Sequence, residues 1–240
     1  MTDLSDATRE KLKTVSVATL STALYKRGFR NQVIQGVQPV GAGKGGNMVG
    51  PAYTMRYIPA REDLNGLEVF RNPEHPQRKG VEECPPGAVM VIDCRKDPRA
   101  ASAGSILATR MQVRGCAGIV TDGGFRDSPE IGALDMPSYH VRPSAPTNLT
   151  CHQAIGLNEP IGCGDAPVFP GDVIVGDAEA VIVIPAHLAD EVAAEAIDMT
   201  AFEDFVTEQV AAGATIIGLY PATKDENVAA FEAWRKANGR

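Results

Sequence analysis

A strand–helix–strand pattern between residues 87 and 121 constrains the fold of this 240-residue chain more than any other feature. The apolar run Gly87-Ala-Val-Met-Val-Ile-Asp93 predicts a buried strand. Residues 104–114 carry apolar side chains at a more helical spacing and end at Gly115, a favoured helix C-cap. Ala117-Gly-Ile-Val-Thr121 predicts a second buried strand. Two strands joined through a helix require parallel pairing and a right-handed crossover, so we predict an α/β fold.

This topology brings polar groups to one edge of the predicted sheet. The helix starts near Gly104–Leu107, and the loop Asp122–Asp127 leaves the second strand at the same edge, where open parallel sheets bind ligands. Helix amides favour anions, and Arg126 can bind a carboxylate with two parallel hydrogen bonds. Asp127 offers a hard oxygen ligand that suits Mg²⁺ or Mn²⁺. An Arg-Asp pair after two glycines is also typical of a plain surface turn, and that alternative stays open.

The same stretch carries a family resemblance. The chain has Gly104-Ser-Ile-Leu107 followed by Arg126-Asp127, with Arg114-Gly115 and Asp122-Gly123 between them. This pattern resembles the signature of one family, which joins the regulator of ribonuclease activity A to the class II 4-hydroxy-4-methyl-2-oxoglutarate aldolases. Further matches are Gly50-Pro-Ala52, Thr54, Pro170-Gly-Asp172, Gly176-Asp177 and Val181-Ile-Val-Ile-Pro185. Together the matches cover most of the chain.

The resemblance implies a layered β/β/α, swivelling-domain-like core in which the parallel strand–helix–strand unit carries the site. It also implies homotrimers, sometimes stacked as hexamers, with pockets between subunits. No composition break divides residues 1–240, so we predict a single domain of this RraA-like type. A stretch rich in proline and charge, about 58–86, is predicted to be an irregular insertion that forms a lid or a subunit contact.

Helical patterns are predicted near both ends of the chain. Residues 5–28 suggest one amphipathic helix, capped by Ser5 or Asp6 and ended by Gly28. Residues 186–212 suggest a long helix, and about 225–237 a terminal helix with a narrow apolar stripe.

The expected chemistry is formation of a pyruvate enolate, which a protein stabilises with a lysine Schiff base or a divalent ion. None of the eight lysines falls in a predicted buried strand where its pKa could be lowered, so the metal route is favoured. The resemblance implies that Asp127 and waters hold Mg²⁺ or Mn²⁺ and that Arg126 is the catalytic residue that also clamps the substrate. It implies that the backbone of Gly104, Ser105, Ile106 and Leu107 binds substrate oxygens.

Ser105 departs from the family pattern, because the well-studied aldolases have an aspartate there. A serine hydroxyl can orient a water but supplies no negative charge, which leaves the exact substrate and the metal affinity open. Further metal ligands would come from an adjacent subunit, with Glu203 as a candidate.

The resemblance therefore predicts a metal-dependent lyase that cleaves a 4-hydroxy-2-oxoacid, such as 4-hydroxy-4-methyl-2-oxoglutarate, to pyruvate and that also decarboxylates oxaloacetate. One alternative is a non-catalytic regulator that binds a ribonuclease. The namesake regulators lack the aspartate after the arginine, whereas this chain has Asp127, so the resemblance favours an enzyme. A lyase for a different, sugar-acid-derived oxoacid is a third reading.

Charge and composition exclude several other classes. With a net charge of −7 and a pI near 5.2, the chain is not expected to bind nucleic acid, which needs clustered Lys and Arg. No apolar run reaches membrane-spanning length and the start resembles no signal peptide, so we expect no membrane partner and a cytoplasmic location.

Other candidate sites have weaker support. The five cysteines form no close pair and are predicted to be reduced; Cys151-His152 with Cys163 lacks a fourth zinc ligand. The glycine-rich residues 41–46 miss the spacing of a phosphate loop and are predicted to form a plain loop. We expect His75 to be solvated. His140 alternates with apolar neighbours, which allows it to point into a cleft, but we favour a satisfied structural histidine.

Overall fold

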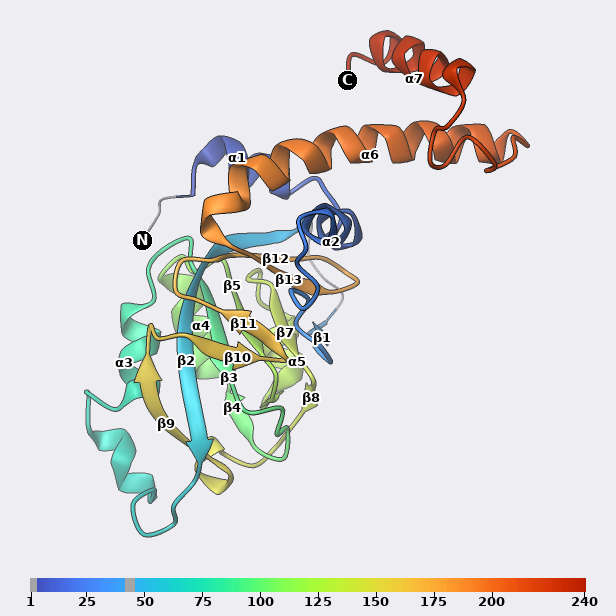
Figure 1. Ribbon diagram of the computed structural model, residues 1–240. Helices are drawn as coiled ribbons and strands as arrows, with labels where there is room; N and C mark the ends of the chain where they lie inside the picture. Colours follow the sequence, from blue (N-terminus) through green and yellow to red (C-terminus); the bar gives the residue numbers. More distant parts are fainter. Residues whose placement is uncertain (1–3, 42–45) are drawn as a thin grey trace.

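A mixed sheet of eight strands forms the centre of the molecule within residues 4–41 and 46–240, the parts that the computed structural model describes (Figure 1). The strand order is β1-β7-β5-β3-β2-β12-β13, and β9 also pairs with β2. The glycine-rich residues 42–45 lie outside the described parts. The strands are β1 (Gln38–Pro39), β2 (Met48–Pro59), β3 (Val89–Asp93), β5 (Gly118–Thr121), β7 (Ser138–His140), β9 (His152–Leu157), β12 (Val173–Gly176) and β13 (Val181–Ile184).

The predicted strand–helix–strand unit is present as β3, α4 (Ser105–Val113) and β5. Strands β3 and β5 pair in parallel, with Val89 opposite Gly118 and Ile92 opposite Thr121, and both strands are fully buried. Gly115 follows the helix with a φ of 82°, the left-handed conformation in which glycine is favoured. The α/β prediction is therefore confirmed.

The layers follow from the period-two alternation of strand side chains. In β3, Met90 and Ile92 pack toward helices α3 (Pro76–Glu83), α4 and α5 (Ser128–Gly132). Val89 and Val91 point to the other face and join the core formed with the hairpin β10 (Ile161–Cys163) and β11 (Ala166–Val168). The sheet thus lies between a helical layer and a second β layer, which agrees with the predicted β/β/α core.

A small parallel sheet extends the unit at the end where α4 begins. It contains β4 (Ala101–Ala103), β6 (Gly124–Phe125) and β8 (Arg142–Pro143), with β6 in the middle. The sequence pattern did not predict β4 and β6, because each is only two or three residues long and has no periodicity to detect.

The N-terminal prediction of one helix over residues 5–28 is wrong in detail. The chain forms α1 (Asp6–Leu12) and α2 (Val17–Lys26) instead. Ser5 accepts a hydrogen bond from the Thr8 amide at 3.1 Å, and Ser16 accepts one from the Thr19 amide at 3.0 Å. Each serine starts its own helix as an N-cap, so Ser16 breaks the predicted helix.

The stretch predicted as irregular, residues 58–86, contains regular structure. A short 3₁₀ helix η1 (Leu67–Arg71) precedes α3. Pro76 occupies the first turn of α3, where its missing amide hydrogen costs nothing. A Cβ on Gly80 would lie 2.7 Å from side-chain atoms of both Met55 and Leu157, so glycine allows α3 to lie close against the sheet.

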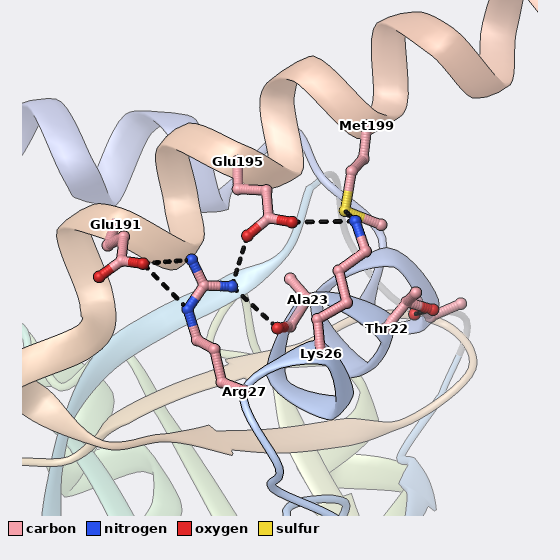
Figure 2. A network of polar contacts seen from close by, with 8 residues as sticks. Thr22, Ala23, Lys26, Arg27, Glu191, Glu195 and Met199 are labelled. Atoms are coloured by element: carbon pink, nitrogen blue, oxygen red, sulfur yellow. Dashed lines mark hydrogen bonds and ion pairs between the residues drawn. The ribbon is translucent and has the colours of Figure 1, made fainter. Parts of the chain in front are cut away.

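Polar contacts fix the long helix α6 (Ala189–Ala211) to α2 (Figure 2). Arg27 donates to Glu191 at 2.6 and 3.2 Å, to the Ala23 carbonyl at 2.9 Å, and to Glu195. Lys26 also donates to Glu195, at 2.9 Å. Beneath these contacts, apolar residues of α1, α2 and α6 form one core with β2, β12 and β13.

The C-terminal part of α6 extends beyond the sheet, and α7 (Asp225–Ala237) lies beside this far end (Figure 1). Two further 3₁₀ helices are η2 (Asn148–Thr150) and η3 (Ala186–Leu188). Among the described residues, the helices are all too short or too polar to cross a lipid bilayer.

Candidate functional site

The N-terminus of α4 meets the segment after β6. Strand β4 leads into Gly104, β6 leads into Arg126, and the two strands are parallel neighbours. The Arg126 amide donates to the Ala103 carbonyl at 3.1 Å. A Cβ on Gly104 would lie 2.8 Å from Cγ of Arg126 and 2.9 Å from Oδ2 of Asp127. Only glycine therefore fits at the N-cap of α4 without displacing both side chains.

Asp127 has a left-handed backbone conformation, with φ 54° and ψ 40°. This conformation is uncommon outside glycine, although aspartate tolerates it better than most residues, and such strain is often found at functional sites. Its Oδ2 accepts from the amide and the hydroxyl of Ser105, both at 3.3 Å, and its Oδ1 lies 3.6 Å from Nε of Arg126. These contacts are long, and the side chain is 37% exposed, so the carboxylate is accessible.

The segments surround a cavity of about 390 Å³. Its volume lies at the lower end of the range of about 300–1,000 Å³ for small-molecule sites. One side consists of Gly104, Ile106, Leu107, Arg126 and Asp127, and another of Leu67, Phe70, Gln77 and Arg78. Ala101, Ala103, Thr147 and Asn148 complete the lining. Ser105 contacts Asp127 but is not itself a lining residue.

The residues predicted for the substrate and metal site, apart from the candidate ligand Glu203, thus lie around one point in space. Ser105, Ile106 and Leu107 form the first turn of α4, where backbone amides have no acceptor within the helix. Only the Ser105 amide bonds to Asp127, so the next two can bind an anion. The arrangement combines helix amides, one guanidinium and one carboxylate at a cavity, which can hold and polarise a small carboxylic acid.

A second cavity, of about 780 Å³, shares Arg126 and Asp127 with the first. His140 lines it, is 4% exposed and packs against Phe125, with the two ring centres 5.6 Å apart. Burial lowers the pKa of His140 to about 4, so the ring is neutral at neutral pH. The expectation of a satisfied histidine is wrong, because Nδ1 of His140 has no hydrogen-bond partner.

The donor set fits a cation that keeps most of its water. Asp127 is the one carboxylate that lines either cavity within the described parts of the chain, and no group of three His, Cys, Asp or Glu is present there. Mg²⁺ is commonly bound by one or two carboxylates plus waters and substrate oxygens. Glu203, the candidate additional ligand, lies on α6 and accepts a hydrogen bond from the Thr19 hydroxyl at 2.7 Å.

Sequence reasoning missed the cavity residues that come from other segments: Gln77, Arg78, Thr147 and Asn148. Pro76 could have indicated the start of α3, but its position beside α4 depends on tertiary contacts. His75, expected to be solvated, is 8% exposed and lies edge-on to Phe70, with ring centres 5.4 Å apart.

Comparison with known proteins identifies the fold and its relatives. A model of the RraA-like family, described as aldolase/RraA, matches residues 2–183. A Halalkalibacterium halodurans protein provisionally named 4-hydroxy-4-methyl-2-oxoglutarate aldolase is 36% identical over 141 residues, which are 58% of this chain and 60% of that protein. That protein and two other curated relatives are each matched over only part of their own length, between 32 and 60%.

Two solved structures share the architecture. Streptomyces coelicolor RraAS2, described as an unusual member of the RNase ES inhibitor RraA protein family, is 26% identical with a TM-score of 0.73, over 84% of this chain and 96% of RraAS2. An uncharacterized protein from Pseudomonas syringae gives a TM-score of 0.75 at 22% identity, over 90% and 98% of the two chains, which is a likeness of fold alone. Because the family model matches most of its length, this chain belongs to the RraA-like (aldolase/RraA) family.

Proposed function

We propose that the protein is a divalent-metal-dependent lyase that cleaves a 4-hydroxy-2-oxoacid to pyruvate and also decarboxylates oxaloacetate. One observation carries the proposal: Arg126 and Asp127 lie beside the first turn of α4 at a cavity of small-molecule size. The family includes aldolases, and the relative from H. halodurans bears such a name, which supports the same activity.

The residues have distinct roles in this proposal. Asp127 would hold Mg²⁺ or Mn²⁺ together with waters, and the ion when bound would act as a Lewis acid on the substrate's 2-oxo group. Arg126, 48% exposed at the cavity, would clamp the substrate carboxylate and offset the enolate charge that develops during cleavage. The amides of Ile106 and Leu107 would bind carboxylate oxygens.

Ser105 has a positioning role. Its hydroxyl and amide both face Oδ2 of Asp127 at 3.3 Å, so they favour one orientation of the carboxylate. Because a serine carries no charge, the site has one fewer negative group than aldolases with aspartate at this place. We propose that this lowers metal affinity, since a cation is held mainly by anionic oxygens.

We also propose a homotrimer or hexamer with sites between subunits, as the family resemblance implies. Two apolar side chains at the cavity support it, because Leu67 is 73% and Ile106 is 82% exposed in the single chain. A neighbouring subunit would cover them.

The test is a pyruvate-release assay on 4-hydroxy-4-methyl-2-oxoglutarate and on oxaloacetate, with Mg²⁺, with Mn²⁺ and with a chelator. We expect activity that the chelator abolishes and that added metal restores. Asp127→Asn should lower kcat at least about a hundredfold, because it removes a charged contact to the transition state. Asparagine tolerates the left-handed backbone, so the variant should keep its fold.

Glu130→Gln is the matched control, since Glu130 is an exposed carboxylate on the neighbouring helix α5 and lines neither cavity. It should retain full activity. Turnover that is insensitive to chelator and unchanged in Asp127→Asn would exclude the proposed mechanism. Sugar-acid-derived oxoacids in the same assay test the alternative substrate class.

A non-catalytic regulator is the second candidate, favoured by the likeness to RraAS2, which belongs to a family described as RNase ES inhibitors. Binding to a ribonuclease would be measured by pull-down and by inhibition of RNA cleavage. Tight binding that Asp127→Asn leaves intact, together with no lyase turnover on any substrate, would establish this function instead.

A further inference from the structure

A second guanidinium lines the cavity from a separate segment of the chain. Arg78 lies in the first turn of α3, and its guanidinium carbon is 4.2 Å from the centre of the Phe70 ring. His75 also contacts the Phe70 ring edge-on, with ring centres 5.4 Å apart. Stacking on an aromatic ring restricts a guanidinium while leaving its N–H groups free.

Arg78 has no carboxylate partner among the described residues. Two other arginines do have such partners, because Arg61 lies 2.7 Å from Asp63 and Arg110 lies 2.8 Å from Glu82. An arginine that lines a cavity without a counter-charge attracts an anion, particularly in a chain whose net charge is −7.

Asn148 provides an independent indication of a binding site. It lines the same cavity, is 4% exposed and accepts a hydrogen bond from the Thr147 hydroxyl at 3.2 Å. Its Nδ2 donor has no partner. A buried donor without an acceptor is costly, so an adjustment of this side chain that brings the donor to a ligand oxygen in the cavity would be favoured.

We infer that Arg78 and Asn148 form a second carboxylate-binding subsite, which selects oxoacids with an additional carboxylate at the end distant from the 2-oxo group. This inference rests on the proposed lyase function, in which Arg126 and Asp127 hold the 2-oxo end. Arg78 is then a specificity-determining residue. It contacts a part of the substrate that does not react, so it contributes to binding in the ground state and the transition state alike.

The kinetic test compares two substrates that differ only in the distal group. 4-Hydroxy-2-oxoglutarate has a carboxylate where 4-hydroxy-2-oxopentanoate has a methyl group. Arg78→Gln should lower kcat/KM for the diacid about 10- to 100-fold, mainly through KM, as expected for the loss of one charged hydrogen-bonding partner. The same variant should change kcat/KM for the monoacid less than about threefold.

Two further variants refine the test. Arg78→Lys keeps the charge but loses the planar stack and the forked donors, so it should recover only part of the preference for the diacid. Arg71→Gln is the matched control, because Arg71 is an exposed arginine at the end of η1 and does not line the cavity. It should behave as the wild type on both substrates.

A binding measurement separates this inference from the proposed activity. Calorimetry with 2-oxoglutarate and 2-oxopentanoate, neither of which has the hydroxyl group needed for aldol cleavage, requires no turnover. With Mg²⁺ present, wild-type protein should bind the diacid at least about tenfold more tightly, and Arg78→Gln should abolish that difference.

Each outcome decides one question. A diacid preference that depends on Arg78 supports the subsite even if no substrate is cleaved, in which case the lyase proposal fails alone. Equal binding of the two acids by wild-type protein, or a preference that survives in Arg78→Gln with an unchanged melting temperature, would overturn the subsite. If Arg78→Gln does not fold, Arg78→Lys takes its place in the same comparison.

Discussion

At the scale of single residues, Gly104 determines whether Arg126 and Asp127 can occupy their positions. Its φ of −130° is open to any residue, so the requirement for glycine is one of space rather than of backbone conformation. A Cβ added to Gly104 would lie 2.8 Å from a side-chain carbon of Arg126 and 2.9 Å from Oδ2 of Asp127, which is too close to both.

We therefore expect Gly104→Ala to impair catalysis without unfolding the protein. The added methyl group would displace both side chains, and misplacement by a fraction of an ångström should lower kcat/KM at least about tenfold. Gly162→Ala is the control, because Gly162 is exposed and a Cβ added there would have no other atom within 4 Å. Steady-state kinetics and melting temperatures of both variants check the prediction, and equal activities would contradict it.

The sequence predicted the neighbours of this glycine but not the full cavity. Gly104–Leu107, Arg126 and Asp127 all follow strands of one parallel unit, so topology alone brings them to one edge. Arg78 and Asn148 reach the cavity through the packing of α3 and η2, which depends on contacts between residues far apart in the chain. No local periodicity encodes such contacts, so these residues were found only in the structure.

At the scale of elements, the position of α6 depends on its contact with α2. Arg27 is central to this contact: its side chain is 18% exposed and donates to Glu191, Glu195 and the Ala23 carbonyl (Figure 2). These partners raise the pKa of Arg27 above its ordinary value, chiefly through the hydrogen bond with Glu195. Lys26 makes a more exposed contact with the same glutamate.

Replacing Arg27 should therefore destabilise the protein more than replacing Lys26. We expect Arg27→Met to lower the free energy of unfolding by about 1–2 kcal/mol, since two carboxylates and a carbonyl lose a charged donor. Lys26→Met should cost less than about 1 kcal/mol, as exposed ion pairs do. Urea unfolding followed by circular dichroism measures both, and equal midpoints for the two variants would rule out a special role for Arg27.

The elements also show where pattern-based prediction succeeds. Strands β3 and β5 and helix α4 were predictable because buried apolar runs and a terminal glycine are local signals. The break between α1 and α2 was missed, since the apolar stripe continues across it while Ser16 caps a new helix. Helix α3 was missed because its sequence, PQRKGVEE, has too few apolar residues to show a period.

At the scale of the whole molecule, α7 stands apart from the sheet (Figure 1). It has no fully buried residue, and its apolar side packs on the end of α6 through Phe231 and Trp234. Trp234 also donates to Glu208 at 2.7 Å. A helix held by one neighbour has a lower local stability than a central strand.

We expect α7 to detach before the core unfolds. Trp234 is the only tryptophan in the chain, so its fluorescence reports this contact alone. In urea, the fluorescence change should precede the loss of far-ultraviolet circular dichroism, and Phe231→Ala should shift only the former to lower urea. Val228→Ala, at a 46%-exposed position on the same helix, should shift neither. Coincident transitions in the wild type would show a single cooperative unit.

The two sides of the 390 Å³ cavity come from different stretches of the chain: α4 and the segment after β6 on one side, η1 and α3 on the other. Under the proposed function, a mutation in residues 67–83 would therefore alter which acids are accepted and leave Arg126 and Asp127 unchanged. If the site acts as proposed, relatives with this fold could diverge in substrate preference through changes confined to this one short segment, while the segments that carry out the reaction keep their sequence.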